Sequence, residues 1–78
     1  MSFSKYIIID NGGVEVPIVF DEILSHKEMS YNKTVISAGF LDVWENEVSV
    51  FGESVTLNIK SRKEDAILIK KMLIHEDF

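Results

Sequence analysis

A chain of 78 residues has room for one domain, which we expect to span residues 1–78, and for a small core only. A domain of this size buries about 60% of the surface that its unfolded form exposes. The absence of cysteine excludes disulfides and thiolate metal sites, so self-association is the remaining source of extra stability. The formal net charge of −5 argues against ordinary DNA or RNA binding, because phosphate contacts need a basic surface.

The apolar run Tyr6–Ile9 is too short for a secretory signal, and no stretch approaches the ~20 apolar residues of a membrane span. We therefore expect a cytoplasmic protein without membrane contact.

The first two predicted elements are strands at residues 5–10 and 14–20, joined by Asn11-Gly12-Gly13. Asn-Gly favours a tight hairpin turn, in which both central residues need positive φ. Pro17 has no N–H to donate to a neighbouring strand, so the second strand is predicted to lie at a sheet edge.

A short helix is predicted next, with Asp21 as its N-cap and residues 22–29 as its body. Residues 34–44 then have the composition of a strand. Gly39 within it indicates a bulge or a place where another segment packs close to the backbone.

Two further strands are predicted at residues 48–51 and 54–60. Their apolar residues fall on positions of opposite parity, which requires a turn or an inserted residue between them. Gly52-Glu53 is therefore a hairpin turn or a bulge in one bent strand, and both remain open.

Ser61-Arg62-Lys63-Glu64 has the pattern of a capping box before a helix predicted at about 62–75. One stripe of this helix can dock on a sheet, formed by Ala66, Ile69, Met72 and Leu73 with Leu68 at its margin. The predicted fold is α+β: an antiparallel sheet of four to five strands and two helices, with the C-terminal helix packed on one sheet face. The order is strand, strand, helix, strand, strand, an optional further strand, and helix.

Ile67 and Ile74 lie away from this stripe, beside Lys70 and Lys71. Two isoleucines on one exposed helix face suggest burial against a second subunit, as in a homodimer, or against another protein. Trp44 is a second candidate contact residue, because Trp is enriched at interface hot spots.

The charges are grouped along the chain, which predicts an acidic and a basic end. The acidic group is Asp42, Glu45, Glu47 and Glu53, and the basic residues follow between 60 and 71. A surface of carboxylates could also imitate nucleic acid toward a DNA- or RNA-binding protein, which is the first alternative function.

Catalytic chemistry is not indicated. His26 is expected in a surface helix and His75 near the terminus, and neither has a recognisable nucleophile partner. We expect no enzyme activity, no metal and no cofactor. The second alternative is an enzyme whose unrecognised site lies between subunits.

Residues Tyr6–Gly12 at the start, and Gly52–Leu57 before a capped helix, give a layout that resembles small uncharacterised proteins of phages and prophages. The resemblance implies a function class only, namely stoichiometric binding to a host or defence protein, including inhibition of CRISPR or other nuclease systems. The expected function is thus a non-enzymatic, self-associating protein-binding module.

Overall fold

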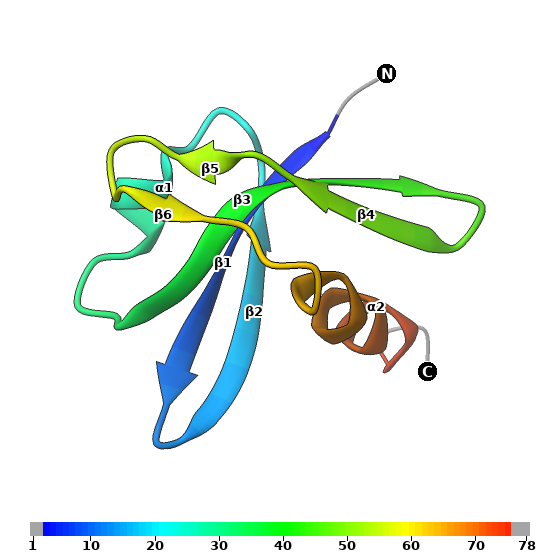
Figure 1. Ribbon diagram of the computed structural model, residues 1–78, viewed down its shortest axis with the longest axis horizontal. Helices are drawn as coiled ribbons and strands as arrows, with labels where there is room; N and C mark the ends of the chain where they lie inside the picture. The colour runs from blue at the N-terminus through cyan, green and yellow to red at the C-terminus, as the bar shows by residue number, and fades with distance from the viewer. Residues whose placement is uncertain (1–2, 76–78) are drawn as a thin grey trace.

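The computed structural model describes residues 3–75, and the side chains of residues 3–73. A four-stranded antiparallel sheet in the order β2-β1-β3-β4, a two-stranded sheet of β5 and β6, and two helices form an α+β fold (Figure 1). The elements are β1 (Ser4–Asn11), β2 (Val14–Phe20), α1 (His26–Met29), β3 (Val35–Trp44), β4 (Glu47–Phe51), β5 (Glu53–Ser54), β6 (Ile59–Lys60) and α2 (Asp65–His75). The predicted fold class and element order are confirmed.

The predicted β1–β2 hairpin forms, but its central turn residues are Gly12 and Gly13, at φ 63° and 89°, and not the predicted Asn-Gly pair, because Asn11 is the last residue of β1. Only glycine adopts such angles without steric cost. The Asp10 carboxylate accepts a hydrogen bond from the Gly13 N–H at 2.8 Å. Pro17 lies opposite Ile8, and β2 is an edge strand, as predicted.

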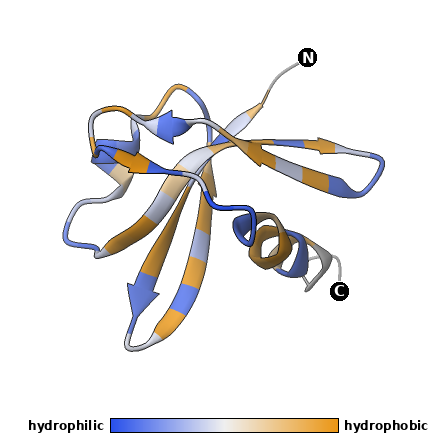
Figure 2. Ribbon diagram, in the orientation of Figure 1, coloured by the Kyte–Doolittle hydropathy of each residue, from blue (hydrophilic) through white to orange (hydrophobic). Residues whose placement is uncertain are grey.

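The C-terminal helix α2 packs on one face of the four-stranded sheet. Tyr6, Ile8, Leu41 and Ile69 are buried together there, and Leu68 and Leu73 of α2 pack against them. Val48 and Val50 of β4 pack against the same cluster. Figure 2 shows apolar and polar residues along this strand. Of the stripe predicted for α2, Ile69, Leu73 and the marginal Leu68 thus face the sheet.

The opposite sheet face has a second cluster of buried residues, formed by Ile7, Phe20 and Ala38. Met29 of α1 and Ile59 of β6 pack against it. Both faces of the central strands are thus covered, whereas the sequence predicted a cover only for the face under the C-terminal helix.

Helix α1 is shorter than predicted and begins elsewhere. Its N-cap is Ser25, whose hydroxyl accepts the Glu28 N–H while the Glu28 carboxylate accepts the Ser25 N–H. These hydrogen bonds lower the pKa of Glu28, and the bond from the Ser25 backbone N–H has the largest effect. Asp21 does not cap α1. It accepts the Ile23 N–H in a separate turn.

The predicted strand at 54–60 is wrong. Residues Glu53–Ser54 and Ile59–Lys60 instead pair as the short strands β5 and β6, with a turn between them in which Asn58 has φ 57°. Gly52, at φ 75°, separates β4 from β5, so the chain leaves the first sheet at this point.

Gly39 marks a close approach. A Cβ at this position would lie 2.7 Å from the Phe51 carbonyl oxygen and 2.9 Å from the Ser61 Cβ. The register shift in this region lies between Ile8 and Ile9 of β1, so Gly39 is not the site of a bulge.

The predicted capping box at Ser61 and Glu64 is also wrong. The Ser61 hydroxyl donates to the Gly52 carbonyl at 2.8 Å, and α2 begins at Asp65. The Asp65 carboxylate takes the place of the cap and accepts the Arg62 N–H at 2.9 Å. Within the described residues, no helix is long and apolar enough to cross a membrane.

Candidate functional site

Strands β3 and β4 form a hairpin that carries aromatic side chains on the sheet face opposite α2. Its two-residue turn is Glu45-Asn46, and both residues have positive φ, as a type I′ turn requires. Side chains alternate between faces along a strand, and residues directly opposite each other share a face. The face shared with Phe40 therefore comprises Phe40, Asp42, Trp44, Glu47, Ser49 and Phe51, which we call the hairpin face.

Three aromatic rings pack together at the end of the hairpin face remote from its turn. Phe40 and Phe51 stack with ring centroids 5.8 Å apart. Phe3 packs edge-on against both, at 5.7 Å from each. Phe3 and Phe51 stay exposed despite these contacts, so the cluster presents apolar area to solvent.

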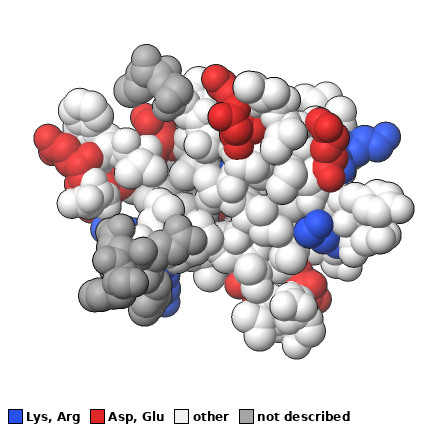
Figure 3. Space-filling view, turned by 180° about the vertical axis from the view of Figure 1, so that it is seen from behind, with Lys and Arg blue, Asp and Glu red and all other residues white. Residues whose placement is uncertain are grey.

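Trp44 lies at the other end of the hairpin face, beside the turn, and its side chain is 68% exposed. Val43, its neighbour on the α2 side of the sheet, is exposed as well. Glu45 lies in the turn and Glu47 lies directly opposite Trp44. Figure 3 shows acidic side chains at its left, the end of the molecule toward which the β3–β4 turn points. An exposed Trp is thus bordered by negative charge.

Helix α2 contributes the second predicted contact surface. Ile67 is 60% exposed, and Lys70, one turn further along, donates a hydrogen bond to the Glu47 carboxylate at 3.0 Å. Residues three apart on a helix share a side, so Ile67 lies on the side of α2 that borders β4. Lys71 is exposed, and the Ile74 side chain lies outside the described part of the chain. Ile67 therefore lies on the α2 side of the sheet and Trp44 on the opposite side, and the edge strand β4 borders both.

The prediction of separate acidic and basic ends is wrong. Lys70 forms an ion pair with Glu47, and Lys60 lies directly opposite Glu53 across β5 and β6. Strand pairing and helix docking bring together charges that the sequence places in separate groups. Glu53 lies on the second sheet, away from the β3–β4 turn (Figure 1). The four predicted carboxylates thus do not form one acidic surface.

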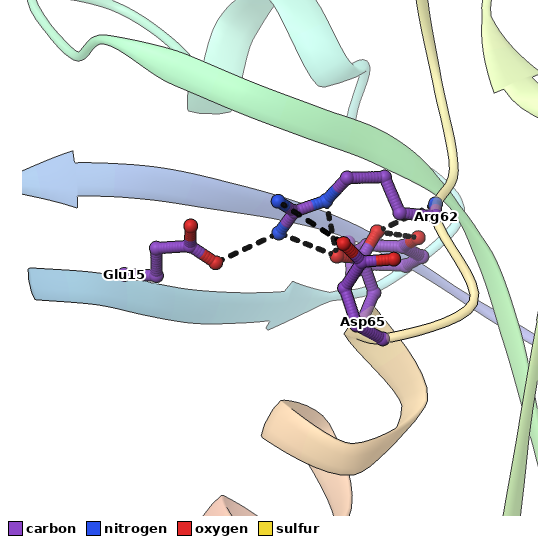
Figure 4. Close-up of polar contacts among 5 residues, drawn as sticks. Glu15, Arg62 and Asp65 are labelled. Atoms are coloured by element: carbon purple, nitrogen blue, oxygen red, sulfur yellow. Dashed lines mark hydrogen bonds and ion pairs between the residues drawn. The ribbon is translucent and has the colours of Figure 1, made fainter.

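A buried polar network that we did not predict lies on the α2 side of the sheet. Tyr6 donates its hydroxyl proton to the Asp65 carboxylate at 2.6 Å. Arg62 pairs with the other oxygen of that carboxylate and with Glu15 of β2, both at 2.8 Å (Figure 4). Asp65 has no exposed area, and Arg62 compensates its charge.

The network raises two pKa values. Burial and the bond to Asp65 raise the pKa of Tyr6 far above its usual value, so the phenol stays neutral. The bond to Glu15, followed by the contacts with Asp65, raises the pKa of Arg62. Tyr6 therefore stays neutral and Arg62 stays charged in a structural network that joins β1, β2 and α2.

Two features of the sequence point toward this network. A Tyr within an apolar strand needs a hydrogen-bond partner when it is buried. Arg62 and Asp65 are three residues apart, a spacing at which side chains on a helix can interact. Neither identifies Asp65 as the partner of Tyr6.

His26 is buried, with its ring edge-on to Phe20 and Phe40 at centroid distances of 5.6 and 5.4 Å. Its Nε2 donates to the Gly39 carbonyl at 2.8 Å, since a carbonyl oxygen only accepts. The His75 side chain lies outside the described part of the chain. Among the described residues, no three His, Asp or Glu side chains gather as a possible metal site.

Comparison with protein-family models, with curated proteins and with solved structures finds no match for this chain.

Proposed function

We propose that this protein is a protein-binding module, and that the β3–β4 hairpin is its contact surface. The exposure of Trp44, whose side chain stands at the tip of a strand hairpin, carries this proposal. An exposed Trp has a large apolar area and few rotatable bonds, so its burial in a partner contributes strongly to affinity. Phe51 and Phe3 extend the apolar area along the same face.

The carboxylates beside Trp44 favour a partner with basic groups around an apolar pocket. Glu45 and Glu47 lie at the rim of the contact surface, where charges mainly change the association rate and its salt dependence. Following the resemblance to small phage proteins, we extend the proposal to a stoichiometric inhibitor or modulator of a host or defence protein.

The experiment compares Trp44→Ala with Val55→Ala in affinity purification from the native host, followed by binding measurements with the purified partner. Val55 is 82% exposed on the β5–β6 turn and is the matched control. Truncating a hot-spot residue costs about 2 kcal/mol or more, which weakens binding roughly 30-fold. Equal affinities of wild type, Trp44→Ala and Val55→Ala would contradict the proposed surface.

A further inference from the structure

We propose that this hairpin also binds a second copy of the chain, joined edge to edge through β4. The inference rests on the proposed function, because it takes the same hairpin as a protein-contact surface. It adds the identity of one partner and the pairing register.

The edge of β4 has the backbone groups that such pairing needs. Trp44 and Glu47 close a two-residue turn and therefore form a hydrogen-bonded pair. Hydrogen-bonded pairs alternate along an antiparallel ladder, so Ser49 and Phe51 also bond to β3. The N–H and C=O groups of Val48 and Val50 consequently point away from β3, and no described strand pairs with this edge.

The five residues of β4 are complementary to themselves in one register. Full antiparallel overlap of two β4 strands places Ser49 opposite Ser49 of the second copy, at a two-fold axis. Val48 of each copy then faces Val50 of the other, and these are the residues whose backbone groups point outward. The strand length therefore selects this alignment, and the hydrogen-bonding phase is compatible with it.

Charge supports this alignment. The alignment places Glu47 of each copy opposite Phe51 of the other copy. The two Glu47 residues are then four positions apart, about 13 Å along the strands. That separation exceeds the Debye length of about 8 Å at physiological salt, so their repulsion is screened. Moving the centre to Val48 would bring the two Glu47 residues within two positions of each other.

The pairing also joins the two exposed surfaces of the protomer. Val48 and Val50 lie on the α2 side, where Lys70 shows that the Ile67 side of the helix borders β4. Ser49 and Phe51 lie on the hairpin face. A second copy at the β4 edge would contact both the α2 side of the sheet and the hairpin face. A partner bound on one of these sides would contact that side only. This added area matters because a five-residue strand pair is small for a stable interface.

The first test is a disulfide across the two-fold axis in Ser49→Cys. The chain has no cysteine, so any covalent dimer must come from the introduced residue. Facing residues of a non-hydrogen-bonded antiparallel pair have Cα atoms about 4.5 Å apart, which a disulfide spans. Under mild oxidation we expect most Ser49→Cys to become a covalent dimer, and Thr34→Cys, at an exposed site before β3, to cross-link at least about tenfold more slowly.

The second test uses charge. Ser49→Lys places two ammonium groups face to face in the dimer, while Asp42 opposite it in the same protomer preserves the hairpin. We expect sedimentation to show a dissociation constant raised roughly tenfold or more, and mixing with Ser49→Glu to restore dimers as a heterodimer. Thr34→Lys is the matched control.

A wild type that stays monomeric at millimolar concentration, or a dimer in which Ser49→Cys and Thr34→Cys cross-link equally, overturns the proposal. Loss of partner binding in Trp44→Ala is measured separately, with purified partner in excess. Failure of the edge pairing and failure of the proposed function can therefore be told apart.

Discussion

At the residue scale, the side chain with the most consequences for the fold is Asp65. Its carboxylate has no exposed area and accepts bonds from the Tyr6 hydroxyl, the Arg62 backbone and the Arg62 guanidinium. Because β1 supplies Tyr6 and α2 supplies Asp65, this group joins residues that are 59 positions apart in the chain. It fixes where the helix begins on the sheet.

We expect Tyr6→Phe to lower the free energy of unfolding by about 1–3 kcal/mol, because a buried carboxylate oxygen loses its neutral donor. Urea unfolding followed by Trp44 fluorescence measures the change. Tyr31→Phe is the control, since Tyr31 is exposed and its hydroxyl should contribute within about 0.5 kcal/mol. If the two variants are equally stable, the Tyr6–Asp65 bond has no net effect on stability.

Single residues also show how far sequence reasoning reaches. The exposure of Ile67 follows from helical periodicity, whereas Trp44 was a candidate contact residue only because of its residue type, and the structure places both at the surface. The contact between Tyr6 and Asp65 depends on how the last helix docks, which no local pattern determines. The sequence therefore shows each residue of the network but does not show that these residues are in contact.

At the element scale, strands with clear turn residues were predicted well, and the short elements were not. The alternation Val55, Leu57, Ile59 satisfies the two-residue period of a strand, yet a four-residue turn between two short strands produces the same pattern. Val55 is exposed, and Ile59 packs against the core. Five residues are too few for periodicity to separate these cases.

The two sequence motifs with capping-box spacing also show that a local pattern alone does not determine the structure. Ser25 and Glu28 form a capping box, whereas Ser61 and Glu64 have the same spacing and do not. The Ser61 hydroxyl bonds to Gly52 because the chain passes β4 at this point. A tertiary contact thus overrides a local signal.

The close passage at Gly39 yields a prediction for the packing of elements. A methyl group there would meet the backbone oxygen of Phe51 and the Cβ of Ser61, so β4 or the segment before α2 must move. We expect Gly39→Ala to lower the free energy of unfolding by about 1–3 kcal/mol, as overpacking does. Chemical denaturation measures it.

The control for this prediction is Gly12→Ala in the β1–β2 turn. No atom lies within 4 Å of an added Cβ there, and the cost comes from the positive φ alone, about 1–2 kcal/mol. Amide chemical shifts separate the two mechanisms. Gly39→Ala should shift residues of β4 and of the segment around Ser61 before α2, and Gly12→Ala should shift the turn only. Unchanged shifts in β4 would contradict the packing argument.

At the scale of the whole molecule, charges that are separate in sequence become neighbours. Lys70 of α2 forms an ion pair with Glu47 of β4, and the pairing of β5 with β6 places Lys60 directly opposite Glu53 in the strand register. An exposed ion pair such as Lys70–Glu47 contributes about 0–1 kcal/mol. Glu47, beside the β4 edge, is thereby paired with Lys70, while Glu45 lies exposed at the turn.

The small size of the core links stability to association. If a second copy binds the folded chain and not the unfolded one, the melting temperature must rise with protein concentration. Above the dissociation constant, a tenfold rise in concentration adds about 0.7 kcal/mol per protomer, or roughly 3–6 °C for a domain of this size. We expect this slope for the wild type and for Thr34→Lys in scanning calorimetry.

Ser49→Lys should melt at one temperature over the same range, because its two-fold contact is repulsive while Asp42 keeps its hairpin intact. A wild-type melting temperature that is independent of concentration would show that the protomer is stable without its β4 edge being paired.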